Sequence, residues 1–286
     1  MYGKLYLCAT PIGNLSDMTD RVKETLSYVD LIAAEDTRNS IKLLNHFGIK
    51  TPMTSYHEYN KVEKAYTLIA KMKEGVNIAL ISDAGTPGIS DPGEVLVRMC
   101  HEEGITVTSL PGPVACITAL TLSGLSTRRF CFEGFLPTDK QEKKIVLNIL
   151  QNETRTIILY AAPHDLKKTI KELYDTLGAR KISICRELTK KFETVYNTTL
   201  EEAIEYYKEN EPKGEYVLVI EGKSLLDIQN EKQSAWQAMS IEEHMALYEQ
   251  DGMDRKSAMK QVAKDRGISK RDVYNYMLTI VNHGNL

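Results

Sequence analysis

The chain has 286 residues, of which 42% are hydrophobic and 26% charged, the composition of an ordinary globular protein. Its formal net charge of −3 argues against binding of nucleic acid through bulk electrostatics. No stretch is apolar over the length of a bilayer span, and the amino terminus lacks the pattern of a signal peptide. The sequence therefore predicts a cytoplasmic protein that does not act at a membrane.

The charged residues are unevenly distributed along the chain, and the cysteines lie far apart in the sequence. From Asp251 onward there are seven Lys or Arg and four Asp residues, giving +3, so the preceding residues sum to −6. A basic end on an acidic body indicates a docking appendage, although a solvated helix face explains the charges equally well. The five cysteines form no CxxC pair, which indicates buried thiols and gives no support to a zinc site.

The first half of the chain alternates strands with helices. Apolar runs predict strands at residues 4–9, 30–34, 78–81 and 105–110, with a helical period following each of them. Residues 55–60 read as a polar loop. Strands that alternate with helices predict a parallel α/β sheet.

Each of these four strands ends in a loop with polar or turn-forming residues. The richest is the stretch 76–93, in which a buried strand leads into two Asp, three Gly and two Pro residues. A tight turn without a ligand would explain one Gly-Pro pair, but not this whole stretch. Because ligands of open α/β sheets bind at the carboxyl ends of the strands, the four loops predict a binding site at that edge.

The second half is less regular. It predicts strands at 130–136, 156–161, 181–187, 194–198 and 215–221, and a mixed sheet. We expect an N-terminal α/β domain at 1–125, a second α/β domain at 126–223, a linker at 224–239 and a helical C-terminal domain at 240–286. The last contains expected helices at 241–250, 255–266 and 270–281, with Ser269 as an N-cap, a pattern compatible with a helix-turn-helix.

Several motifs of familiar chemistry are missing, including the phosphate-binding P-loop, GxGxxG, HExxH and GxSxG. Polar candidates gather at the strand ends instead: Glu35, Asp36, Arg38, Asp83, Asp91, Glu187, Lys190 and Glu193. A turn that offers backbone N–H groups and one Asp suits a ligand with an adenine and a ribose.

These loops resemble motifs of the tetrapyrrole-methylase superfamily and, within it, of the ribosomal RNA small-subunit methyltransferase I branch. The matching segments are TPIGNL at 10–15, EDTR at 35–38, SDAGTPGISDPG at 82–93, PGP at 111–113, FEGFLP at 132–137, RELTK at 186–190 and GE at 214–215. The resemblance covers residues 1–223 and, more weakly, the C-terminal extension.

The resemblance implies a two-domain tetrapyrrole-methylase-like α/β fold, with S-adenosylmethionine in the interdomain cleft, plus a small helical C-terminal domain. It implies a homodimer that methylates the ribose 2′-hydroxyl of a cytidine in the decoding region of 16S rRNA, in the small ribosomal subunit. Porphyrin-modifying members have a GxGPG-like first loop and a GDP turn, whereas this chain has TPIG and SDAG. That departure disfavours the alternative, a methylase of a tetrapyrrole-like small molecule. A non-enzymatic regulator that binds an adenosyl ligand is a third hypothesis.

The resemblance also assigns residues. Those expected to bind S-adenosylmethionine are Pro11, Gly13, Asp83, Ala84, Gly85, Thr86, Gly112, Pro113, Val114, Ala115, Tyr160 and Ala161. Packing of Tyr160 in the core is an equal alternative. Methyl transfer from a sulfonium needs no metal, and no metal site is expected.

A ribose hydroxyl is a weak nucleophile, so a positioned general base should assist it. The candidates are Asp36, Glu187 and Lys190, of which Lys190 would need a lowered pKa. The expected RNA contacts are Arg38, His57, Arg186, Lys256 and Lys260. An ion pair between Arg186 and Glu187, or a solvated loop at His57, remain structural alternatives.

Overall fold

The computed structural model describes residues 1–283. The chain divides into two compact units, one from Met1 to Glu221 and one from Gly222 onward. The first unit contains two five-stranded sheets, and the second unit is helical.

The first sheet is parallel, with strand order β3-β2-β4-β1-β5. Its strands are β1 (Leu5–Cys8), β2 (Leu31–Ala34), β3 (Met53–Ser55), β4 (Ile78–Ile81) and β5 (Val107–Leu110). The parallel sheet expected from the sequence is confirmed. Strand β3 was not predicted, because three residues are too few to display an apolar period, and the expected polar loop begins at its last residue.

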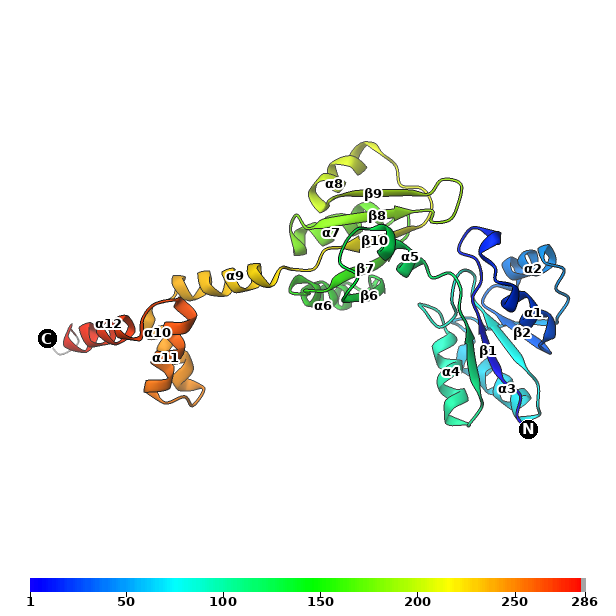
Figure 1. Cartoon of the computed structure of the whole chain (residues 1–286), viewed down its shortest axis with the longest axis horizontal. Coiled ribbons are helices and arrows are strands. Elements are labelled where there is room, and N and C mark those ends of the chain that lie inside the picture. The colour runs from blue at the N-terminus through cyan, green and yellow to red at the C-terminus, as the bar shows by residue number, and fades with distance from the viewer. Residues whose placement is uncertain (284–286) are drawn as a thin grey trace. The chain divides into compact units, whose positions relative to one another are not determined.

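Helices cover both faces of this sheet (Figure 1). On one face lie α1 (Asp20–Tyr28) and α2 (Thr37–His46), and on the other α3 (Lys61–Lys73) and α4 (Gly93–Glu102). Successive side chains of a strand point to opposite faces, so a strand between two helix layers is apolar throughout. All four residues of β4 are buried for this reason. The polar loops at the carboxyl ends are thereby brought to one edge.

The second sheet is mixed, with order β6-β7-β10-β8-β9, as expected. Strands β6 (Phe130–Phe135) and β7 (Thr156–Ala161) are parallel, while β10 (Tyr216–Ile220) is antiparallel to both β7 and β8 (Lys181–Arg186), and β9 (Thr194–Thr199) is antiparallel to β8. Helices α6 (Lys140–Gln151), α7 (Leu166–Leu177) and α8 (Leu200–Glu209) pack on one face.

Helix α5 (Ala115–Leu122) packs on the opposite face of the second sheet. Its Cys116, Ala119 and Leu120 side chains join a buried cluster with Ile158 and Val217 of that sheet. The chain thus reaches the second sheet before residue 126, where we expect the domain boundary. The boundary itself stays a prediction.

The C-terminal unit contains α9 (Leu225–Ala238), α10 (Ile241–Gln250), α11 (Arg255–Arg266) and α12 (Lys270–His283). Its core includes Met245, Val262 and Val273. The three helices expected from the sequence are present, and Ser269 caps α12 by accepting a hydrogen bond from the Asp272 N–H. None of the described helices is both long and apolar enough to cross a membrane.

Most of the expected linker, 224–239, is the helix α9. The Ser224 side chain caps it by accepting from the N–H groups of Leu226 and Asp227. The Trp236 ring stacks on the buried His244 ring, with 4.0 Å between centroids. None of the α9 side chains that the structure describes is fully buried, so the helix shows no apolar period, and the sequence pattern did not reveal it.

Candidate active site

A cavity of about 460 Å³ lies at the carboxyl edge of the first sheet. Loops of the first half of the chain supply Ile12, Glu35, Ser82, Asp83, Ala84, Gly85, Thr86, Ile89, Ser90, Asp91, Val114 and Ala115. The second sheet and its loops supply Phe135, Tyr160, Ala161, Ala162, Pro163, Leu188, Glu215, Tyr216 and Val217. The volume is that of a site for a cofactor-sized ligand.

The loop between β4 and α4 is held in shape by Asp91. Its carboxylate accepts hydrogen bonds from the N–H groups of Gly88, Ile89 and Gly93 at 2.8–3.2 Å. A Cβ atom at Gly93 would lie 2.8 Å from Asp91 Oδ1 and 2.9 Å from Gly88 N, so only glycine fits. This carboxylate therefore has a structural partner for each of its oxygens.

Loops from three strands are joined beneath the cavity. Thr10 and Gly85 form an antiparallel bridge, with both backbone N–H···O distances at 2.8–3.0 Å. The Thr86 hydroxyl donates to the Pro113 carbonyl at 3.1 Å. The cavity floor is thus fixed by hydrogen bonds between segments that are far apart in the sequence.

The opposite wall is mainly apolar. The Tyr160 ring meets the rings of Phe132 and Phe135 edge-on, with centroids 4.9 and 5.5 Å apart. Burial, and then the nearby Cys116, raise the pKa of the Tyr160 hydroxyl, which therefore stays neutral. This wall offers a surface against which a flat ring can stack.

The charge of the cavity is negative. Four carboxylates line it, those of Glu35, Asp83, Asp91 and Glu215, and no Lys or Arg side chain does so among the described residues. Burial raises the pKa of Glu35, and the carboxylates of Asp83, Asp91 and Asp36 add to this effect, although the Asp83 N–H opposes it. Such a cavity favours a ligand that carries positive charge.

Comparisons with known proteins agree with this geometry. The sequence model of the family described as Tetrapyrrole (Corrin/Porphyrin) Methylases matches residues 4–204. A Synechocystis protein named Ribosomal RNA small subunit methyltransferase I is 47% identical, over 99% of this chain and 100% of its own length. Proteins of the same name from Bacillus subtilis and Escherichia coli O157:H7 are 45% and 44% identical, each over 96% of this chain.

The chain belongs to the tetrapyrrole methylase family, in its ribosomal RNA small subunit methyltransferase I branch. Solved structures agree on the fold. A uroporphyrin-III-C-methyltransferase from Thermus thermophilus matches 77% of this chain and 94% of its own, with a TM-score of 0.55 and 18% identity. A diphthine synthase matches 78% and 91%, with a TM-score of 0.61 and 15% identity.

Most of the residues that the family resemblance assigns to S-adenosylmethionine lie at the cavity. Those in its lining are Asp83, Ala84, Gly85, Thr86, Val114, Ala115, Tyr160 and Ala161. Of the other four, Pro11, Gly13 and Pro113 adjoin the lining residues Ile12 and Val114, and Gly112 is two residues before Val114. Their role as cofactor contacts stays a prediction.

Asp36 lies outside the cavity lining, at the start of α2. Its carboxylate accepts from the Arg38 backbone N–H at 2.8 Å, and from the Arg38 guanidinium at 2.8 and 3.1 Å. The hydrogen bonds from Arg38 lower the pKa of Asp36 to about 2. An acid so strong makes a weak general base, and Asp36 acts here as a helix cap.

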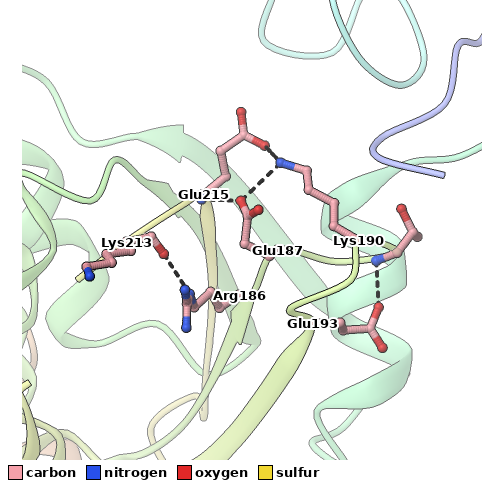
Figure 2. Close-up of polar contacts among 7 residues, drawn as sticks. Arg186, Glu187, Lys190, Glu193, Lys213 and Glu215 are labelled. Atoms are coloured by element: carbon pink, nitrogen blue, oxygen red, sulfur yellow. Dashed lines mark hydrogen bonds and ion pairs between the residues drawn. The ribbon is translucent and has the colours of Figure 1, made fainter. Parts of the chain in front are cut away.

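Glu187 and Lys190 form a network with Glu215 at the end of β8 (Figure 2). The Lys190 ammonium lies 3.0 Å from Glu187 Oε1 and 2.7 Å from Glu215 Oε2, and Glu187 Oε1 also accepts from the Glu215 N–H. Partial burial raises the pKa of Glu187, but the Glu215 N–H and Lys190 outweigh it, so the pKa falls below its ordinary value.

The same network decides the charge of Lys190. Partial burial lowers its pKa, but Glu215 and Glu187 outweigh this effect and raise it. A Lys190 base would require a lowered pKa, and the structure gives a raised one, so this expectation is wrong. The catalytic role of Glu187 and Lys190 stays a prediction, and neither lines the cavity.

The residues predicted to contact RNA lie in different surroundings. The Arg38 side chain is 87% exposed. Arg186 donates from Nε to the Lys213 carbonyl at 2.6 Å, with no ion pair to Glu187 among the described contacts (Figure 2). The His57 Nδ1 atom is buried without a hydrogen-bond partner in the described part of the chain. Lys256 and Lys260 are exposed on α11, in the C-terminal unit.

The sequence motifs did not assign several lining residues to the site. Glu35 stood among the polar candidates but received no role, and Glu215 belonged to a quoted motif. Phe135 and Leu188 also belonged to quoted motifs, but like Tyr216 and Val217 they received no role, because an apolar side chain at a strand end gives no signal of its own. Only the packing of the second sheet against the loops of the first brings them to the cavity.

Proposed function

We propose that this protein transfers the methyl group of S-adenosylmethionine to the 2′-hydroxyl of a cytidine ribose in the decoding region of 16S rRNA. The observation that carries the proposal is the end-to-end similarity to proteins named Ribosomal RNA small subunit methyltransferase I, at 44–47% identity over 96–99% of the chain. The similarity includes the helical C-terminal unit as well as the two sheets.

The cavity fits the proposed methyl donor. Its volume suits an adenosyl ligand, Asp83 offers carboxylate oxygens to ribose hydroxyls, and its acids favour a cation. When bound, S-adenosylmethionine supplies an electrophilic methyl group on a positively charged sulfur. The chain's own part is to align the acceptor hydroxyl and to keep water out.

The RNA would be held by local basic groups, because the body of the protein is acidic. From Asp251 onward the chain carries a charge of +3 against −6 before it. Exposed Lys256 and Lys260 on α11, with Arg38 and Arg186 in the first unit, are the proposed phosphate contacts. We further propose action in the cytoplasm, the small ribosomal subunit as partner and a homodimer as the working form.

The deciding experiment is transfer of labelled methyl from S-adenosylmethionine to small ribosomal subunits isolated from cells that lack this protein. We expect label on the ribose of one cytidine in the decoding region. Deproteinised 16S rRNA, assayed in parallel, separates the assembled subunit from free RNA as the substrate. Tight donor binding without transfer to either form would contradict the proposal and favour a small-molecule acceptor such as a tetrapyrrole.

A further inference from the structure

The cavity wall contains four carboxylates, and their surroundings differ. Asp91 is committed to its own loop, with both oxygens accepting backbone N–H groups. Glu215 is paired with the Lys190 ammonium at 2.7 Å. A carboxylate occupied in either way is poorly placed to accept a proton, because protonation would break the contacts that stabilise its charge.

Asp83 differs from the other acids in its position. Its side chain accepts the Asp36 N–H at 3.2 Å and belongs to the turn that offers backbone groups to an adenosyl ligand. It is the acid of that turn, and a contact with ribose hydroxyls of the donor suits it. Glu35 is then the remaining cavity acid, and its structural contacts are the weakest of the four.

Glu35 follows β2 directly and is partly buried. Among the described residues, the one hydrogen bond to its carboxylate comes from the Asp83 N–H, at a long 3.4 Å. No cation pairs with it in the described part of the chain. The charged groups that face it are the carboxylates of Asp83, Asp91 and Asp36.

We propose that Glu35 is the general base of the reaction and accepts the proton of the acceptor hydroxyl. The inference rests on the proposed function. As the hydroxyl oxygen forms its bond to the methyl carbon, the carbon–sulfur bond breaks and its electron pair stays on sulfur, which becomes a neutral thioether. The hydroxyl proton moves to a Glu35 carboxylate oxygen and later to water, so no further reactant is needed.

The environment of Glu35 suits this step. A general base works best when its pKa approaches the working pH. Burial and the surrounding acids raise the pKa of Glu35, whereas Arg38 lowers that of Asp36 to about 2. Protonation of Glu35 also relieves repulsion among the acids, so the proton it receives is stabilised in place.

The test is the substitution Glu35→Gln, which preserves the shape and leaves an oxygen to accept the Asp83 N–H. Glu94→Gln is the matched control, because Glu94 undergoes the same change at an exposed position in the first turn of α4, outside the cavity lining. For each variant we would measure donor binding and RNA binding by calorimetry, and methyl transfer against pH under saturating conditions.

We expect Glu35→Gln to lower the turnover number about 10²- to 10⁴-fold while both dissociation constants stay within about threefold. The wild type and Glu94→Gln should lose turnover as the pH falls through the pKa of Glu35, and Glu35→Gln should lack that dependence.

Turnover of Glu35→Gln close to that of the wild type would overturn the inference, and so would loss of donor binding, which would make Glu35 a binding residue. Failure of the proposed function is a different result: the wild type itself would then leave no methyl group on rRNA.

Discussion

The Lys190 ammonium lies 2.7 Å from the Glu215 carboxylate, 25 residues further along the chain. Glu215 lines the cavity and Lys190 does not, so the lysine holds a cavity acid in place without reaching the ligand space itself. Lys190 also contacts Glu187, at 3.0 Å. The backbone of Glu187 is in the left-handed region, with a φ of 51°. This geometry favours a positioning role for Lys190 over a catalytic one.

Replacement of Lys190 tests that role. Because exposed ion pairs contribute roughly 0.2–1 kcal/mol, Lys190→Met should weaken donor binding by up to about fivefold. Lys190→Arg should restore binding, because it keeps the charge beside Glu215. Titration calorimetry with S-adenosylmethionine measures both. Two variants that bind the donor normally and yet lack methyl transfer would instead support a catalytic Lys190.

Gly13 joins the two halves of the first unit by close contact. A Cβ atom there would lie 2.4 Å from Lys190 Cγ and 2.9 Å from Thr189 Oγ1, so Gly13→Ala should push two loops apart. We expect a loss of roughly 1–3 kcal/mol in the free energy of unfolding. Donor affinity should also fall, by about tenfold or more. Urea denaturation and calorimetry test the two effects.

Gly104→Ala is the control for that substitution. Gly104 has a φ of 68°, and a Cβ atom added there would meet no described heavy atom within 4 Å, so its replacement strains the backbone alone. It should cost about 1–2 kcal/mol in stability and leave donor affinity unchanged. Equal loss of donor affinity in both variants would show that general destabilisation, and no specific contact at Gly13, weakens binding.

The basic face of α11 predicts a salt effect. Replacing Lys256 and Lys260 together with Ala should weaken binding of 16S rRNA and reduce the slope of log K against log salt by roughly 1.5, because about 0.7–0.9 counterions are released per phosphate contact. Donor affinity should not change. The control is the double variant Lys50→Ala with Lys71→Ala, which removes two exposed charges elsewhere. An equal loss of RNA affinity in the control would show that the effect comes from net charge and that α11 makes no specific contact.

The ion pair of Glu153 with Arg155 should make the free energy of unfolding depend on pH. Its carboxylate accepts from Arg155 Nε at 2.9 Å and Nη2 at 2.6 Å, and these bonds lower its pKa from 4.5 to about 2. A lowered folded-state pKa gives stability that is fully present above about pH 4.5 and is lost as the pH falls towards 2. Glu153→Gln should therefore cost roughly 1–2 kcal/mol at pH 7, and the difference from the wild type should vanish near pH 2. A difference that stays constant from pH 7 to 2 would contradict this account.

The amino-acid sequence predicted most of the strands and helices along the chain, a parallel first sheet, a mixed second sheet and the edge at which the polar loops meet. These are local features: a run such as Ile78–Ile81 is apolar throughout because helices cover both of its faces, and Gly and Pro mark where such a run stops. The same kind of signal failed for β3 and for α9, since three residues show no period and an exposed helix has no apolar face to display.

The surroundings of each strand-end acid, by contrast, depend on the tertiary structure. Asp36 and Glu35 are neighbours in the sequence. The Asp36 carboxylate nevertheless forms an ion pair with Arg38, whereas Glu35 lies in the cavity beside Asp83, 48 residues away. Partial burial lowers the pKa of Lys190, and Glu215, 25 residues along the chain, outweighs that effect together with Glu187. Burial and charge at a site depend on distances between remote segments, and a linear pattern of residue types does not contain those distances.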